Sequence, residues 1–345
     1  MRKFWFPGLL LGLFVSACSN EFDVAAPYQD IPVVYGVVSP DDTAHYIRVE
    51  RAFIDPKASA YEVSLIADSI YYPANAISVF LERVSTGQRY QFTRVDGNLE
   101  GHVRESGTFA QAPNWLYKLK PSQPGGIIKG GEKYKLVIER ADGRAPVTAE
   151  TEVPDTLFLN SPKTEDIPRQ IAIHGPNPSA IDFRVSKEAY IFDVYINIRY
   201  RELAPDGTLL GNKNVRWQIG KNILRENNLI GGGYYRGKAF YQARDFYTFL
   251  LGNVDTVANV QRYFNGFDIE VEGAGPEIAK YQESEAINAG LTGAEISTRY
   301  TNLSEGYGIF TAKRAWRFEE FDLKPVSFDS LNANARRRIL LKFKG

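Results

Sequence analysis

Residues 31–51 read IPVVYGVVSPDDTAHYIRVER, and this stretch decides the fold class of the chain. Its first part, Pro32–Val38, is an apolar run that ends in the turn-forming cluster Ser39–Asp42, a pattern typical of a strand and its turn. In the second part, His45–Arg51, polar and apolar side chains alternate, which is typical of a strand with one face in water. The stretch therefore predicts two consecutive strands.

The same pattern continues as far as Pro154. Four more runs rich in strand-favouring residues are separated by turns of Gly, Pro and Asp, namely Ile77–Arg83, Arg89–Thr93, Tyr134–Glu139 and Val147–Val153. Short strands at this spacing predict a β-sandwich domain, to which we assign residues 27–154. Residues 58–75 are less strand-like. We expect one or two helical turns there, in a segment that either packs on the sheet edge or forms a functional loop.

The remainder, residues 155–345, predicts a second β-rich domain with a few short helices. The expected strands are Ala180–Val185, Tyr190–Leu203, Asn214–Gly220, Gly266–Gly273 and a closing strand in Arg337–Lys344. Helices are predicted at Ala243–Leu251, where aromatic and leucine side chains share one face, and at Pro276–Ala289, which has proline in its first turn. The fold class predicted for the whole chain is therefore mainly β.

The first eighteen residues are typical of a secretory signal. Arg2 and Lys3 precede the apolar run Phe4–Val15, which is too short to span a bilayer, and Val15-Ser16-Ala17-Cys18 has the form of a lipobox. We therefore expect residues 1–17 to be a signal peptide, Cys18 to be lipidated after cleavage, and residues 18–26 to be a lipidated tether. Cys18 is the only cysteine, so the chain is expected to form no internal disulfide.

Composition excludes some classes of function. With 41 basic and 41 acidic residues the chain lacks the basic excess of nucleic-acid-binding proteins, so no nucleic-acid partner is expected. His45, His102 and His174 are the only histidines, and none has metal-ligand spacing. The chain also lacks a Gly-x-Ser-x-Gly elbow, and Gly231–Gly233 lacks the Lys-Ser/Thr of a phosphate-binding loop. We therefore expect no metal, no cofactor and no enzymatic activity.

Aromatic clusters beside glycine and asparagine give the best indication of a binding surface. Tyr234 and Tyr235 follow three glycines, so we predict them as ligand-binding residues. Similar clusters occur at Tyr71-Tyr72 and in Tyr300–Phe310. The alternative for most of these rings is ordinary packing in the core or on a sheet face.

Several segments together resemble a known family. They are the lipobox Val15–Cys18, the blocks Ile31–Val38 and His45–Arg51, the sequence Val153-Pro154-Asp155 and the stretch Tyr300–Phe310. In these the chain resembles the Bacteroidetes outer-membrane lipoproteins of domain of unknown function 4249. The resemblance implies an N-terminal immunoglobulin-like β-sandwich, a second β-rich domain, residence at the outer membrane and association with a TonB-dependent barrel. It carries over no catalytic residue.

A short motif points to the same cell envelope. Asp followed by Ser or Thr and then a small or aliphatic residue resembles the O-glycosylation sequon of exported Bacteroidetes proteins. The candidate hydroxyls are Thr43, Ser69, Thr156, Thr256 and Ser330. Alternatively, these hydroxyls form turns.

The function expected from the sequence is that of a non-enzymatic, lipid-anchored binding or assembly module of the cell envelope. The lipid on Cys18 would join it to the outer membrane, on the periplasmic or the cell-surface face, and its partner would be an outer-membrane β-barrel or a glycan. The alternatives are a carbohydrate-active or peptide-active surface enzyme and a subunit of an export or adhesion assembly. An enzyme would need a concave pocket with convergent acids, whereas a binding module would present a ring-lined surface.

Overall fold

The computed structural model describes residues 31–52, 59–121, 126–255, 259–288, 299–333, 341 and 343–344. The predicted signal peptide, the tether with Cys18, and Thr256 lie outside the described residues. The described chain is mainly β, as predicted, with several antiparallel and mixed sheets and few short helices. No helix in the described segments has the length and apolar character needed to cross a membrane.

The strands follow one another along the chain with few interruptions. They are β1 (Ile31–Val38), β2 (His45–Ala52), β3 (Ile77–Arg83), β4 (Gln88–Gln91), β5 (Thr93–Asp96), β6 (Trp115–Leu119), β7 (Lys133–Arg140), β8 (Val147–Glu152), β9 (Leu157–Ser161), β10 (Gln170–Ile171), β11 (Ser179–Val185), β12 (Ile191–Leu203), β13 (Leu209–Leu224), β14 (Tyr235–Tyr241), β15 (Gln261–Ala274), β16 (Tyr307–Leu323) and β17 (Phe343–Lys344). The helices are α1 (Ala60–Ser64), α2 (Ala67–Ile70), the 3-10 turn η1 (Gly97–Glu100), α3 (Ala243–Asn253), α4 (Pro276–Asn288) and α5 (Pro325–Ala333).

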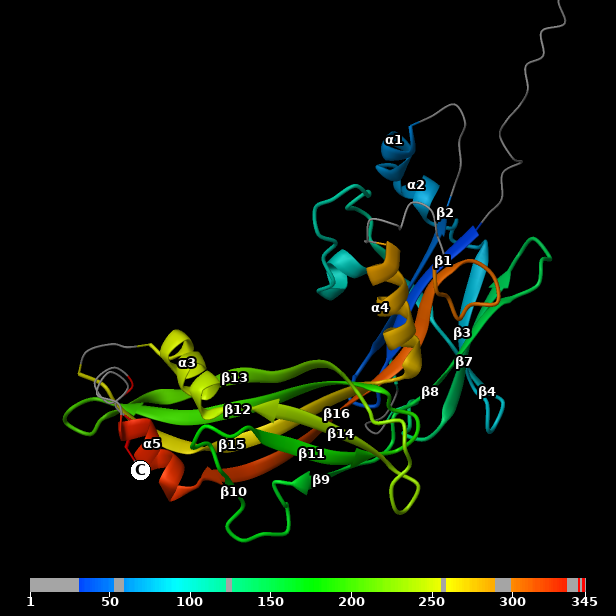
Figure 1. Ribbon diagram of the computed structural model, residues 1–345. Helices are drawn as coiled ribbons and strands as arrows, with labels where there is room; N and C mark the ends of the chain where they lie inside the picture. Colours follow the sequence, from blue (N-terminus) through cyan, green and yellow to red (C-terminus); the bar gives the residue numbers. More distant parts are fainter. Residues whose placement is uncertain are drawn as a thin grey trace, which may run out of the picture.

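Two lobes meet at a bend, and the long strand β16 passes through both of them (Figure 1). A ten-stranded sheet has the order β13-β12-β15-β16-β1-β2-β6-β5, with β10 beside β16 and β17 beside β15. The first part of β16 runs parallel to β1, and its later part runs antiparallel to β15. The predicted boundary after residue 154 falls between β8 and β9, yet the ten-stranded sheet continues from one lobe into the other through β16.

Glycine permits the close contact between β1 and β16. Gly308 has φ +105°, a backbone conformation that residues with a Cβ rarely adopt. A Cβ atom at Gly308 would overlap the carbonyl oxygen of Val34 and lie 2.8 Å from its carbonyl carbon. Gly306, with φ +98°, makes the same kind of approach to Pro32. The two glycines therefore allow the parallel pairing that joins the lobes.

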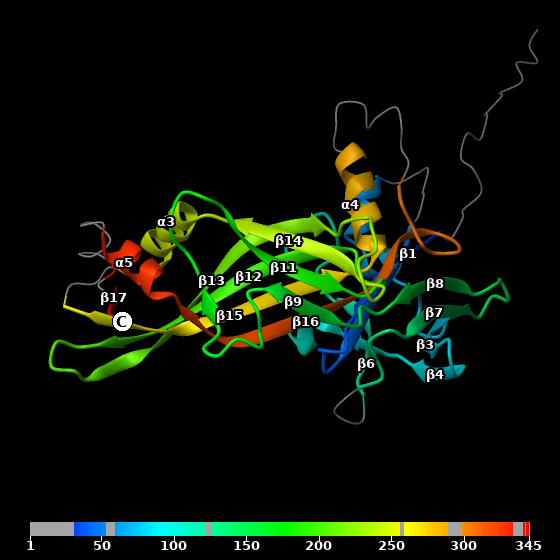
Figure 2. The same ribbon diagram turned by 60° about the horizontal axis from the view of Figure 1, so that its bottom comes forward.

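The N-terminal lobe has a core between two sheets. Side chains of β1, β2 and β16 pack against those of the four-stranded sheet β4-β3-β7-β8, which lies to one side of the bend (Figure 2). Val34, Ile47, Leu81, Leu136 and Phe310 are all fully buried in this cluster. Because successive side chains of a strand point to opposite faces, the residues between them lie on the outer faces, where Tyr35 is exposed and Thr311 is covered by α4.

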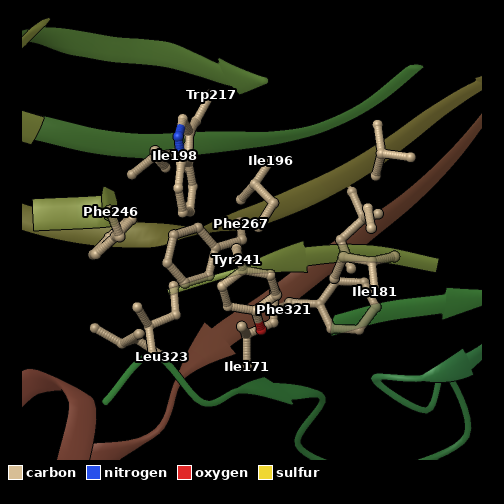
Figure 3. Packing of buried hydrophobic residues seen from close by; sticks show 14 of the residues in the cluster. Ile171, Ile181, Ile196, Ile198, Trp217, Tyr241, Phe246, Phe267, Phe321 and Leu323 are labelled. Atoms are coloured by element: carbon tan, nitrogen blue, oxygen red, sulfur yellow. The ribbon is translucent and has the colours of Figure 1, made fainter. Parts of the chain in front are cut away.

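The C-terminal lobe has the larger core. The three-stranded sheet β14-β11-β9 lies across one face of the long sheet, and α3 and α5 close its far end (Figures 1 and 2). Figure 3 shows Phe246 of α3, Phe267 of β15 and Phe321 of β16 converging in this core. The inward orientation predicted for alternate residues of the Gly266–Gly273 strand is confirmed, since Phe267, Ile269 and Val271 are fully buried.

Most expected elements are present. The strand predictions from Ile31 to Gly273 match strands of the structure, although several run longer than expected, and helices occur where α1 to α4 were predicted. Strands β6, β9 and β14, helix α5 and above all β16 were not predicted. Of the closing strand expected in Arg337–Lys344, the described residues show only the two-residue β17.

Candidate functional site

An open groove of about 670 Å³ lies on the solvent face of β1, β2 and β16. Its volume falls within the range of small-molecule sites, roughly 300–1,000 Å³. The residues that line it are Tyr35, Gly36, Val37, Asp42, Thr43, Ala44, Tyr46, Arg48, His102, Leu116, Ile309 and Lys313. We call this feature the ligand groove.

Strand periodicity explains why these side chains face the groove. Val34 and Val38 of β1 point into the core, so Tyr35 and Val37 between them point out, and they remain 39% and 38% exposed. The same alternation in β2 turns Tyr46 outward beside buried Ile47. The wet face predicted for His45–Arg51 therefore forms the floor of the ligand groove.

Two aromatic rings in contact, Tyr46 and His102, form one side of the groove. The ring centroids of Tyr46 and His102 are 4.1 Å apart, and the ammonium group of Lys118 lies 5.6 Å from the Tyr46 ring. The Tyr46 hydroxyl donates to Glu100 at 3.3 Å, and Lys118 forms an ion pair with the same carboxylate. Hydrogen bonding from Lys118 lowers the pKa of Glu100. These contacts hold the Tyr46 ring at the side of the groove.

Helix α4 packs against Tyr35, one of the rings that line the groove. The ring of Tyr281 in α4 meets that of Tyr35 edge-on, with centroids 6.3 Å apart. Burial, together with the neighbouring Tyr35 side chain, raises the pKa of Tyr281 above that of an ordinary tyrosine. At the start of α4, Glu277 accepts a 3.3 Å hydrogen bond from Thr311 of β16, and burial raises its pKa. The helix is thereby fixed to the outer face of the sheet.

Two cationic side chains line the groove, Arg48 and Lys313. Arg48 and Arg104 donate to the same oxygen of Glu50, at 3.0 and 2.7 Å, so their guanidinium groups are fixed in place. Lys313 is exposed, and it also lines a smaller cavity of about 190 Å³ beside α4. The groove thus combines aromatic rings with positively charged groups.

The smaller cavity contains two acids. Asp193 of β12 and Glu272 of β15 are directly opposite each other across the two strands. Asp193 accepts a 2.7 Å hydrogen bond from the backbone N–H of Asn222, and Glu272 accepts one of 2.5 Å from Arg216. Both carboxylates therefore already have partners within the protein.

No metal centre is found in the part of the chain that the structure describes, where no three His, Cys, Asp or Glu side chains are grouped to hold an ion. His45 is buried in β2, and burial lowers its pKa. His102 faces the ligand groove, whereas His174 is exposed in the other lobe. The three histidines are therefore not brought together.

The two predicted ligand-binding tyrosines do not line the groove. Tyr234 is half-buried against Phe158, at a centroid distance of 5.6 Å, with Arg184 nearby. Tyr235 is also half-buried and stacks on Arg225 at 3.5 Å. The neighbouring tyrosines thus belong to two separate ring–arginine contacts, and their role in ligand binding stays a prediction.

Other aromatic candidates are core residues. Tyr71 and Tyr72 are 3% and 5% exposed, so their rings take part in packing. Tyr307 of the Tyr300–Phe310 stretch is exposed, whereas Phe310 is fully buried.

The candidate glycosylation hydroxyls differ in their surroundings. Thr43 is exposed and lies in the ligand groove. Ser69 of α2 and Ser330 of α5 are half-buried, and Thr156 is half-buried and donates to Asp155 at 2.9 Å. Thr256 lies outside the described residues. Their modification stays a prediction.

The groove was not recognised from the sequence. The alternation in β2 placed Tyr46 and Arg48 on a wet face, but Tyr46 and His102 are far apart in the sequence. The loop before β6 brings His102 to Tyr46, and the parallel pairing of β1 with β16 brings in Lys313. Only the topology unites these residues.

Comparison with protein-family models and with curated proteins gives no match for this chain. The function is therefore inferred from the ligand groove and from the sequence patterns.

Proposed function

We propose that this chain is a lipid-anchored protein of the cell envelope that binds a saccharide in the ligand groove and does not transform it. The observation that carries the proposal is the set of rings that line the groove, Tyr35, Tyr46 and His102, together with the cationic Arg48 and Lys313. Ring faces suit the apolar C–H faces of a sugar, while hydroxyl and cationic groups suit its polar edge.

The charges favour an acidic saccharide. Two cationic side chains, Arg48 and Lys313, line the groove against one acid, Asp42, which lies in the turn after β1. Lys313, and Arg48 beside its ion pair with Glu50, would meet a carboxylate or sulfate with charge-assisted hydrogen bonds, which are about twice as strong as neutral ones. Because the groove is open along the sheet, a short oligosaccharide fits it better than an enclosed small molecule does.

The location and family belong to the same proposal. The lipobox ending at Cys18 supports lipid anchoring at the outer membrane, and the segments quoted above support membership of the lipoprotein family of domain of unknown function 4249. The paired sheets of the N-terminal lobe support an immunoglobulin-like sandwich there. An outer-membrane β-barrel of the TonB-dependent kind would then be the partner that receives the bound glycan.

The test is calorimetric titration with a panel of neutral, uronic-acid-containing and sulfated oligosaccharides. An acidic oligosaccharide should bind, and Tyr46→Ala should weaken it about tenfold, which corresponds to about 1.4 kcal/mol. Phe240→Ala is the matched control, because that ring in β14 is 63% exposed and lies outside the groove, and it should leave affinity unchanged. Equal binding by wild type and Tyr46→Ala would overturn the proposal.

A second candidate function rests on the two acids of the smaller cavity. Asp193 and Glu272 are directly opposed strand residues, whose Cβ atoms lie roughly 5 Å apart, and a retaining glycosidase also uses two neighbouring carboxylates. The same panel is therefore analysed for shortened products by mass spectrometry. Cleavage that is lost in both Asp193→Asn and Glu272→Gln would replace the binding proposal with a carbohydrate-active enzyme.

A further inference from the structure

A patch of exposed apolar side chains occupies the end of the N-terminal lobe. Tyr61, Leu65 and Ile66, in and just after α1, are 60%, 46% and 53% exposed, and Phe109 in the following loop is 45% exposed. We call these four residues the apolar tip. Single exposed apolar residues are ordinary, but a group of large ones on one small unit indicates a contact surface.

Hydrogen bonds and a small core of its own hold the apolar tip in a defined arrangement. The hydroxyl of Ser64 donates to the carbonyl of Thr108, and the N–H of Ala110 donates to the carbonyl of Ser64 at 2.9 Å. These bonds tie α1 to the loop that carries Phe109. Beneath them Ile70 and Tyr71 form a small core of their own with Ala110.

The apolar tip lies at the end of the lobe where the chain enters β1. Ile31 pairs with Ala52, and the neighbouring Arg51 donates to the carbonyls of Asp68 and Ser69 in α2, at 2.7 and 3.2 Å. Helices α1 and α2 therefore stand beside the start of β1, as Figure 1 shows. The bulk of the C-terminal lobe lies on the other side of the bend.

The length of chain before β1 limits how far this end can lie from a lipid on Cys18. The 13 residue steps from Cys18 to Ile31 can span at most roughly 45 Å. A lipid anchor would therefore keep the start of β1, with the apolar tip beside it, within roughly 45 Å of the bilayer surface, a distance that allows contact.

We infer that the apolar tip inserts into the lipid surface and sets the orientation of the anchored protein. This inference rests on the lipid anchoring in the proposed function. Neither α1 nor α2 contains a lysine or arginine, and each carries one acid, Glu62 and Asp68. Arg104, whose guanidinium lies 5.1 Å from the centre of the Phe109 ring, is paired with Glu50. Attraction to anionic headgroups thus contributes little, and the contact is apolar, as in interfacial helices that bury side chains below the headgroups. The bilayer contact leaves the ligand groove above the surface.

The test uses the full lipidated protein in vesicles of phosphatidylethanolamine and phosphatidylglycerol. Acylation consumes the only native thiol, so a cysteine introduced by Ile66→Cys can be labelled alone with an environment-sensitive dye. Leu210→Cys, at a position 56% exposed near the far end of the C-terminal lobe, is the matched control. Quenching by nitroxide-labelled lipids should be at least threefold stronger at position 66 than at position 210, and it should not change with salt.

The outcomes separate the two proposals. Protein that fails to float with the vesicles would overturn the lipid anchor and with it the orientation. Protein that floats but shows equal lipid quenching at both positions would overturn insertion of the apolar tip and leave the anchor standing. The third outcome is a dye at position 66 that is shielded from aqueous iodide without being quenched by the lipids. That result would show that protein, and not the bilayer, covers the apolar tip, and it would also overturn insertion.

Discussion

The substitution Gly308→Ala tests the pairing that joins the two lobes. Gly308 lies in β16 opposite Val34 of β1, at the parallel contact, and its φ is +105°. An alanine methyl would meet the backbone of Val34, with its Cβ 2.8 Å from the carbonyl carbon. Backbone atoms cannot rotate away as a flexible side chain could, so the two strands must separate.

Two costs add at this position. A residue with a Cβ in this backbone region costs about 1–3 kcal/mol, and forcing a methyl into a packed contact costs about 1–3 kcal/mol more. We therefore expect Gly308→Ala to lower the free energy of unfolding by about 2–6 kcal/mol. This is a large share of the 5–15 kcal/mol typical of folded proteins, and it corresponds to a fall in Tm of roughly 5–20 °C.

The assay is thermal unfolding of purified wild type and variants, followed by circular dichroism and calorimetry. Gly252→Ala is the control, because an added Cβ there meets nothing within 4 Å in helix α3, where alanine is favoured over glycine by up to about 1 kcal/mol. Its Tm should stay or rise. A Gly308→Ala protein as stable as wild type would refute the close parallel pairing of β1 with β16.

Two further predictions concern ion pairs. Glu202→Ala should lower the free energy of unfolding by about 3–5 kcal/mol, because fully buried Arg262, which donates to Glu202 at 2.9 Å, would lose its carboxylate partner. Denaturant titration measures this loss. The double variant Glu202→Ala with Arg262→Met should recover part of it, because the buried charge is then removed as well. Hydrogen bonding from Arg140 lowers the pKa of Glu305, so this pair stabilises the fold above the ordinary glutamate pKa and the contribution is lost as pH falls through the lowered value. Stability of wild type measured between pH 6 and pH 2.5 should therefore fall more steeply than that of Glu305→Gln, and parallel curves would contradict the linkage.

Local sequence patterns predicted the strands whose faces alternate or whose residues are uniformly apolar. Strand β12 is an example, since Phe192, Val194, Ile196 and Ile198 are all buried on one face. Strand β16 escaped prediction because the glycines at 306 and 308 resemble a loop. These glycines allow β16 to approach β1 closely, and this can be seen only in the folded structure, where β1, some 270 residues earlier in the chain, lies against them.

The candidate site, like β16, could be predicted from local sequence patterns only in part. Alternation predicted that Tyr46 and Arg48 face water, which is confirmed, but no local pattern relates Tyr46 to His102 or Tyr35 to Tyr281. Tyr234 and Tyr235 were predicted as ligand-binding residues because they follow three glycines. Tyr234 lies just before β14 and Tyr235 is the first residue of that strand, and the two rings contact different arginines, Arg184 and Arg225.

The most direct measurement of the central claim is a histidine-selective NMR titration with the acidic oligosaccharide. The three histidines lie in distinct surroundings: His102 is in the ligand groove, His45 is buried in β2, and His174 is exposed in the other lobe. We predict that the ring signals of His102 shift in proportion to bound ligand while those of His174 stay fixed. Saturable binding that moves His174, or that leaves His102 unchanged, would contradict a binding site over β1, β2 and β16.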